Sequence, residues 1–130
     1  MAMKIQELNS YLVVFHKGKV LLLKRDTDLW EFPGGGVDWG EDPIKTAIRE
    51  TKEETGLDVR NVGFLTVTSA TYEKDGNEKH SVYIVYKGET DSEEVKLSGE
   101  HKEYRWLSLM EAKYLKFALN AEDVLGMISD

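Results

Sequence analysis

Three closely spaced glutamates, Glu50, Glu53 and Glu54, are the residues of this sequence best suited to chemistry. They follow Arg49 in the stretch RETKEETG, and spacings of one, three and four residues place them side by side on a helix. Like charges at such helical spacings cost roughly 0.2–0.5 kcal/mol per pair. Clustered carboxylates are the ligands that Mg²⁺, Mn²⁺ and Ca²⁺ prefer. The cluster therefore predicts a cation site that is open on one side for substrate phosphates.

The glutamates alone are equally compatible with a solvated helix face, because glutamate is a good helix former. Gly34, Gly35 and Gly36 precede them, and glycines let a backbone approach a ligand closely and present its amides and carbonyls. A tight connection from a strand to a helix would by itself also explain the glycines. The fixed order of glycine loop, capped helix and carboxylate cluster is what favours the cation site.

A helix over residues 43–55 must position these carboxylates. Asp42 is a favoured N-cap, Pro43 a favoured first helical residue, and Gly56 fits the position that ends a helix. Projection at about 100° per residue gathers the glutamates on one face. The buried stripe that this projection predicts beside them consists of Ile44, Ala47, Ile48, Thr51 and Thr55.

The other elements are mostly strands. Apolar and alternating runs predict a hairpin over 10–25 and strands over 29–32, 61–72, 79–88 and 103–109. The stretches LMEAKYLKF and NAEDVLGMI predict two short helices. Consecutive hairpins with few helices favour an α+β fold built on a mixed sheet. The length of 130 residues predicts one domain over residues 1–130.

The stretch from residue 35 to residue 57 resembles the Nudix box, Gly-x5-Glu-x7-Arg-Glu-U-x-Glu-Glu-x-Gly-U, in which U is a bulky apolar residue. Its glycine and charged positions are all matched, by Gly35, Glu41, Arg49, Glu50, Glu53, Glu54 and Gly56. Thr51 departs from the pattern, but its hydroxyl can bond back to a helix carbonyl, so we expect an effect on packing more than on chemistry. The flanking stretches LWEFPGGGV and YRWLSLMEA are also similar to this family.

The resemblance implies an α/β/α sandwich around a mixed sheet. It also implies a hydrolase that cleaves the phosphoanhydride of a nucleoside diphosphate linked to another group. The usual metal is magnesium, with manganese as an alternative. The implied ligands are the carboxylates of Glu50, Glu53 and Glu54 and the carbonyl of Gly34.

The resemblance assigns supporting roles as well. Arg49 would orient a glutamate, and Glu41 would pair with Arg49 if the loop before the helix folds back. Glu50 is the favoured general base, and Glu100 is the second candidate.

The stretch SGEHKEYRWL, over residues 98–107, resembles part of the diadenosine tetraphosphate hydrolases within the family. Glu100 would complete the metal site, as an acidic residue in this region often does in the family. An exposed loop glutamate is the equal alternative, and Glu103 is the fallback ligand. His101 has no histidine partner nearby, so we expect it at the surface.

Candidate substrate-binding residues are Gly35, Gly36, Trp39 and Asn120. Trp39 precedes the helix, where it would edge the cleft or simply pack on the loop. Asn120 falls where mutator-type Nudix enzymes carry a purine-reading asparagine, although NAED is also a good helix N-cap.

Composition limits the class of substrate. A net charge of −7 argues against long nucleic acid. The absence of cysteine excludes disulfides and thiol nucleophiles and suits a reducing cytoplasm. No apolar run reaches the ~20 residues that cross a bilayer, and no signal peptide is evident.

These observations predict a hydrolase that converts a (d)NTP or an oxidised purine nucleotide to NMP and pyrophosphate. The alternatives are a dinucleoside polyphosphate or nucleotide-sugar hydrolase, an enzyme acting on RNA 5′ ends, and a non-catalytic nucleotide-binding regulator. Since many relatives are dimers, a homodimer is an option.

Overall fold

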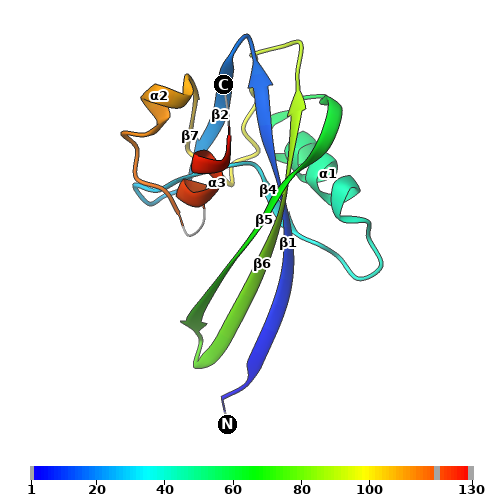
Figure 1. Ribbon diagram of the computed structural model, residues 1–130, viewed down its shortest axis with the longest axis vertical. Coiled ribbons are helices and arrows are strands. Elements are labelled where there is room, and N and C mark those ends of the chain that lie inside the picture. Colours follow the sequence, from blue (N-terminus) through cyan, green and yellow to red (C-terminus); the bar gives the residue numbers. More distant parts are fainter. Residues whose placement is uncertain (1, 119–120, 129–130) are drawn as a thin grey trace.

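The computed structural model describes residues 2–118 and 121–128 (Figure 1). In chain order its elements are β1 (Lys4–His16), β2 (Lys19–Lys24), β3 (Trp30–Glu31), β4 (Gly34–Gly36), α1 (Pro43–Thr55), β5 (Arg60–Lys74), β6 (Asn77–Glu89), β7 (Glu103–Leu107), α2 (Leu109–Ala112) and α3 (Ala121–Met127). The predicted strands and helices are all present, but several differ from expectation. β1 begins at Lys4, before the predicted hairpin, the predicted glycine loop forms strand β4, and the helix predicted over LMEAKYLKF ends at Ala112. The last predicted strand is shorter than expected, because Ser108 caps α2.

The strands form one mixed sheet, as expected for the α+β class. β1 pairs in parallel with β6 and antiparallel with β2 and β4. β5 and β6 form a long hairpin, and β2 also pairs with β3 and β7. Both predicted hairpin turns have positive φ at two successive residues, at Lys17-Gly18 and at Asp75-Gly76.

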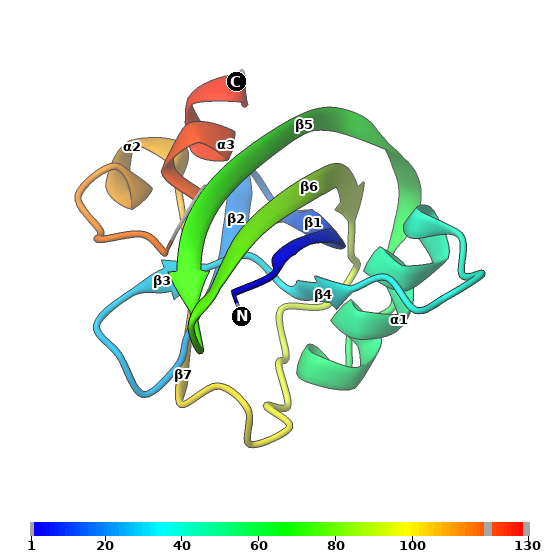
Figure 2. The same ribbon diagram turned by 90° about the horizontal axis from the view of Figure 1, so that it is seen from below.

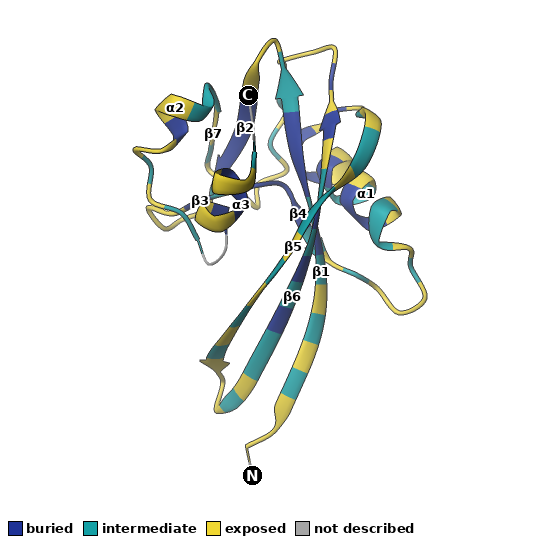
Figure 3. Cartoon of the chain, viewed as in Figure 1, coloured by how far each residue is buried: buried dark blue, intermediate teal, exposed yellow. Residues whose placement is uncertain are grey.

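Both faces of the central strands are buried, so the sheet lies between two layers of helix (Figure 3). Leu12, Val14, Leu21 and Leu23 face the side covered by α1. Val13, Val20 and Leu22 alternate with them and face the side covered by α2 and α3. Alternate residues of one strand thus support opposite layers, which is the predicted α/β/α sandwich.

The first part of β1 and the ends of β5 and β6 extend beyond these helices as a twisted arm, residues 4–8 and 71–80 (Figure 1). No residue of the arm is buried. Figure 2 shows β5 and β6 curling over β1.

Helix α1 has the predicted bounds. Asp42 Oδ1 accepts a hydrogen bond from the Ile44 amide, and Gly56 ends the helix with a φ of 76°. Ser10 of β1 donates to the Pro43 carbonyl (2.6 Å), which fixes the start of the helix against the sheet. Thr51 donates to a carbonyl one turn earlier, as expected.

The buried stripe of α1 is rotated from the predicted one. Thr46 and Glu54 are buried, whereas Ile48 is 37% exposed and Ile44 is half-buried. α1 contacts β4 and β1, and its buried residues other than Glu54 are small: Thr46 together with Ala47, Thr51 and Thr55, which were predicted to be buried. This rotation draws one carboxylate of the cluster into the interior.

Candidate metal and active site

The glycine loop packs against two glutamates of α1. The Gly34 amide donates a hydrogen bond to Glu54 Oε1 (3.2 Å). A Cβ atom at Gly34 would strike the Tyr11 ring, and one at Gly35 would lie 2.9 Å from Glu50 Cδ. Gly34 is therefore needed for β4 to pair this closely with β1, and Gly35 lets Glu50 of α1 approach β4.

Glu54 is the innermost carboxylate, with 2% of its surface exposed. Its Oε2 is buried and has no hydrogen-bond partner within the described part of the chain. Burial above all raises the pKa of Glu54, to about 9; the Gly34 hydrogen bond opposes the shift, and the charges of Glu100 and Glu50 add to it. A divalent cation would stabilise the ionised form, and the unpaired oxygen is suited to ligate it.

Arg49 links the other carboxylates. Its Nε and Nη2 donate to the two Glu41 oxygens (2.8 and 3.0 Å), and Nη1 donates to Glu53 Oε1 (3.1 Å) and Glu50 Oε1 (3.3 Å). The loop before α1 thus folds back far enough for Glu41 to reach Arg49. Hydrogen bonds from Arg49, and then from Thr46, lower the pKa of Glu41 to about 2. Glu41 remains an anion that fixes Arg49 in front of the other two glutamates.

Glu100 lies beside the innermost carboxylate. One ligand atom each of Glu54, Glu100 and His101 lies within 4.8 Å of the other two. The Glu100 side chain is 45% exposed and forms an ion pair with Arg25 (3.5 Å). This position agrees with the ligand role, which stays a prediction. The fallback residue, Glu103, instead pairs with a lysine of β2.

The expectation that His101 lies at the surface is wrong. Its side chain is fully buried, and Nε2 lies 2.9 Å from Glu31 Oε2. The Lys102 amide donates to the Lys24 carbonyl (2.7 Å), which extends the ladder of β2 with β7 and places the preceding histidine near β3. This contact joins segments distant in sequence, so local pattern could not reveal it.

Glu31 is a residue that the sequence analysis missed. It also accepts a hydrogen bond from Arg25 Nε (3.0 Å). Burial opposes the ionisation of Glu31, but the hydrogen bonds from His101 and Arg25 lower its pKa overall. The signal that could have found it is an acid inside the apolar stretch LWEF.

The surroundings of the predicted substrate-binding residues differ from one residue to the next. Trp39 is fully exposed in the loop before α1, which rules out the packing alternative. Its neighbour Asp38 lies 3.5 Å from Arg49, so the loop is close to the carboxylates. Gly36 has open space where a Cβ atom would be. Asn120 lies outside the described residues.

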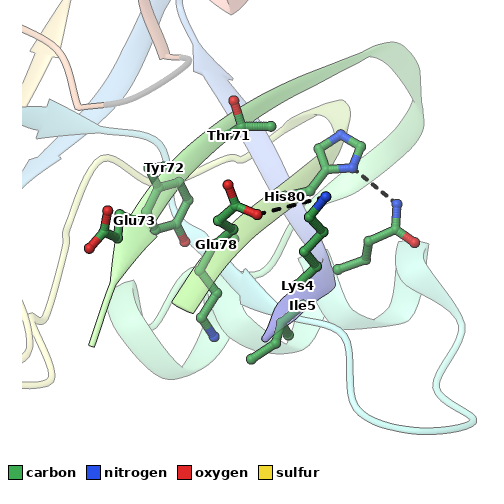
Figure 4. Close-up of a pocket in the computed structure, with 9 residues that line it drawn as sticks. Lys4, Ile5, Thr71, Tyr72, Glu73, Glu78 and His80 are labelled. Carbon is green, nitrogen blue, oxygen red and sulfur yellow. Dashed lines mark hydrogen bonds and ion pairs between the residues drawn. The ribbon is translucent and has the colours of Figure 1, made fainter. Parts of the chain in front are cut away.

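Two hollows differ in their relation to the carboxylates. A small cavity of about 30 Å³ adjoins Glu31 and is lined by Tyr11, Phe32, Val85 and Val124 and by two alanines. A hollow of about 630 Å³ lies on the arm, where Lys4–Glu78 (3.9 Å) and Gln6–His80 (3.0 Å) pair across strands (Figure 4). None of the clustered carboxylates lines this larger hollow.

The fold and the carboxylate site together define a class. A curled mixed sheet between helices, with a glycine loop against a carboxylate-bearing helix, is matched by the profile of the NUDIX domain over residues 8–125. The chain belongs to the NUDIX family. None of the helices within the described residues has the length and apolarity needed to cross a bilayer.

Particular relatives are similar over part of their length. The mouse bis(5′-nucleosyl)-tetraphosphatase [asymmetrical] is 36% identical over 85 residues, and the pig protein of that name 42% over 89. Each alignment covers 64% of this chain, and the chain spans 58% of the length of these curated relatives. An RNA pyrophosphohydrolase of Psychrobacter cryohalolentis is 47% identical over 53 residues, 40% of this chain and 31% of that protein.

Solved structures are similar over most of the chain. A MutT NUDIX hydrolase from Burkholderia pseudomallei aligns with a TM-score of 0.83 and 24% identity, covering 96% of this chain and 99% of that one. An Ap4A hydrolase of C. elegans, in a binary complex, aligns with a TM-score of 0.71 and 29% identity over 93% of each chain. The first likeness supports the fold alone.

Proposed function

We propose that this protein is a divalent-cation-dependent pyrophosphohydrolase of nucleoside polyphosphates. The observation that carries the proposal is the buried Oε2 atom of Glu54, which has no hydrogen-bond partner among the residues that the structure describes. Glu54 lies against the glycine loop and beside Glu50 and Glu100. An oxygen cluster of this kind suits a hard cation, for which we propose magnesium, with manganese as the alternative.

The chain's own residues divide the work of the reaction. When bound, the cation neutralises phosphate oxygens and acidifies a bound water. Glu50, Glu53, Glu54 and Glu100 would hold it, with the Gly34 carbonyl as a further ligand. Glu50 would accept the proton of the attacking water, since it lies beside the loop that approaches the substrate.

Arg49 positions the reacting carboxylates rather than acting on the substrate. Its two-pronged bond to Glu41 leaves Nη1 to hold Glu50 and Glu53. The backbone of Gly35 and Gly36 would approach the phosphate chain, and Trp39 would edge its entrance.

Three classes of substrate are candidates. Similarity to the two bis(5′-nucleosyl)-tetraphosphatases over about 64% of the chain favours a dinucleoside polyphosphate cut into unequal nucleotides. A (d)NTP or an oxidised purine nucleotide, cut to NMP and pyrophosphate, is the second candidate. A nucleotide sugar is the third.

A hydrolysis screen tests these candidates. Diadenosine tetraphosphate, dNTPs, 8-oxo-dGTP, a nucleotide sugar and 5′-triphosphorylated RNA are incubated with the protein and Mg²⁺, and the products are resolved by chromatography. We expect ATP and AMP from diadenosine tetraphosphate. Glu54→Gln should abolish turnover, whereas Glu73→Gln on the exposed arm should not.

Other outcomes of the screen discriminate the remaining hypotheses. Tight nucleotide binding without turnover on the whole panel would indicate a nucleotide-binding regulator instead. Turnover of the RNA alone would contradict the expectation, from the net charge of −7, that no long nucleic acid is bound.

The proposal extends to assembly and location. Residues 4–8 of β1 pair with β6 on one edge, while on the other edge β4 pairs from Asn9 onward and the Val37 amide donates to the Leu8 carbonyl. Within the described residues, no strand pairs with residues 4–7 on that edge. This uncovered edge supports a homodimer, which sedimentation equilibrium would test. The absence of cysteine supports a cytoplasmic enzyme.

A further inference from the structure

We propose that His101 is a nitrogen ligand of the cation, whose Nδ1 atom completes a site formed with the carboxylates of Glu54 and Glu100. This inference rests on the cation site of the proposed function. It adds a ligand of a different chemical type, and it thereby changes which cations the site prefers.

The geometry of the three side chains suits one ion. Glu54 comes from α1, whereas Glu100 and His101 come from the segment before β7. One ligand atom of each lies within 4.8 Å of the other two. An ion equidistant from three atoms at that limit lies about 2.8 Å from each, whereas metal–oxygen and metal–nitrogen bonds are about 2.0–2.3 Å long. Shifts of roughly half an ångström in the three side chains would therefore let one ion bind them all.

Two atoms of this group are buried and unsatisfied. Glu54 Oε2 and His101 Nδ1 both lack a hydrogen-bond partner among residues 2–118 and 121–128. Each residue is only 2% exposed. A buried polar atom without a partner destabilises a fold. An acceptor oxygen and a ring nitrogen left unpaired in the same cluster point to a cation that binds both.

The second ring nitrogen of His101, Nε2, carries the hydrogen of the neutral imidazole. Nε2 lies 2.9 Å from Glu31 Oε2, and an ionised carboxylate can only accept, so Nε2 donates. In the neutral ring, Nδ1 then keeps its lone pair for a metal. Arg25 Nε holds the same Glu31 oxygen at 3.0 Å. Metal-binding histidines commonly donate their second N–H to a carboxylate in this way, which fixes the tautomer and the orientation of the ring.

The site also has a route to solvent. Glu100 is 45% exposed, whereas Glu54 and His101 are buried. A cation would therefore meet Glu100 first and the two buried ligands afterwards. Glu100 forms an ion pair with Arg25 at 3.5 Å. Such a partly exposed ion pair contributes little to stability, so Glu100 can leave it to bind a metal.

An imidazole ligand has a consequence for selectivity. Carboxylate and water ligands suit Mg²⁺, whereas imidazole favours later transition metals such as Co²⁺ and Zn²⁺. We expect the removal of Nδ1 to weaken Co²⁺ binding roughly tenfold or more and to change Mg²⁺ binding by much less.

Pulsed EPR of bound Mn²⁺ tests the contact directly. The wild-type protein should show modulation from a directly bound ¹⁴N nucleus. His101→Gln should lose it, because glutamine can still donate to Glu31 but has no atom equivalent to Nδ1. His80→Gln, on the arm, is the matched control and should retain the modulation. Calorimetry with Co²⁺ and with Mg²⁺ on the same proteins measures the change in selectivity.

Each result decides the matter. Bound Mn²⁺ without ¹⁴N modulation in the wild type would overturn the nitrogen ligand, as would modulation that persists in His101→Gln. If His101→Gln does not fold, the double variant His16→Gln, His80→Gln leaves His101 as the sole histidine, and its modulation must remain. Turnover with Mg²⁺ and no nitrogen ligand would leave the proposed function standing, whereas a protein that binds no cation would defeat both proposals.

Discussion

Glu41 and Glu54 carry the same functional group, but their surroundings drive their pKa values in opposite directions. Arg49 donates two hydrogen bonds to Glu41 and lowers its pKa to about 2. Burial raises the pKa of Glu54 to about 9. Near neutral pH and without a cation, one carboxyl is an anchored anion and the other holds a proton. At the proposed cation site, Glu54 would thus need a bound cation to ionise near neutral pH, whereas Glu41 is ionised and holds Arg49.

The first prediction at the scale of residues concerns pH. A carboxyl with a pKa of about 9 when folded and 4.5 otherwise binds more protons in the folded state, so the stability of the cation-free protein falls as pH rises from about 4.5 to 9. Thermal melts in a chelating buffer, at several pH values, measure this decline. Glu54→Gln should remove most of this decline in stability. A decline of the same slope in that variant would show that Glu54 is not the carboxyl responsible.

The second prediction concerns the cation. Mg²⁺ should raise the melting temperature, because a ligand at a hundred times its Kd stabilises the folded state by about 2.7 kcal/mol. Glu50→Gln, Glu53→Gln and Glu54→Gln should each reduce that rise, whereas Glu73→Gln on the arm should leave it unchanged. Equal rises in melting temperature in the wild type and all three site variants would contradict the cation site and support the alternative, a solvated helix face.

At the scale of elements, the close contact of α1 with β4 creates the site. Small residues on the buried side of α1 allow this approach, and Gly35 of β4 has no Cβ atom to meet the Glu50 side chain. The rotated stripe of the helix and the burial of Glu54 are two results of the same contact.

The glycine contact gives the third prediction. Gly34→Ala should lower the free energy of unfolding by about 1–3 kcal/mol, because its Cβ atom would strike Tyr11 and backbone that cannot move aside. Gly36→Ala, at a position with open space, is the matched control and should change it by less than about 0.5 kcal/mol. Chemical denaturation measures both, and equal losses would show that the loop has no such steric limit.

The elements also show what sequence can and cannot predict. Both ends of α1 and both hairpin turns follow from local signals, namely Asp42, Gly56 and the glycines at positions 18 and 76. The contact of Glu41 with Arg49 was expected from a family pattern. The burial of His101 and its bond to Glu31 were not expected, because they join β3 to the segment before β7 through a sheet whose strand order the sequence does not state.

At the scale of the whole molecule, the core and the arm differ in how well their residues are buried. Alternate residues of β1 and β2 support helices on opposite faces, so the site rests on the best-packed strands. The arm carries no buried residue and stands apart from the carboxylates. Substitutions there serve as controls for those in the site.

The parallel pairing of β1 with β6 has a consequence for the order of folding. Lys4 lies opposite Glu78 and Phe15 opposite Glu89. The parallel hydrogen bonds of β1 therefore cannot form until β6 is available. Pairing between strands this far apart in sequence slows folding, because the chain between them loses conformational entropy before the contacts form. We expect a chain stalled on the ribosome before residue 77 to remain sensitive to protease, and one stalled well after residue 107 to become resistant. Resistance in the shorter chain would mean that β1 finds another partner first.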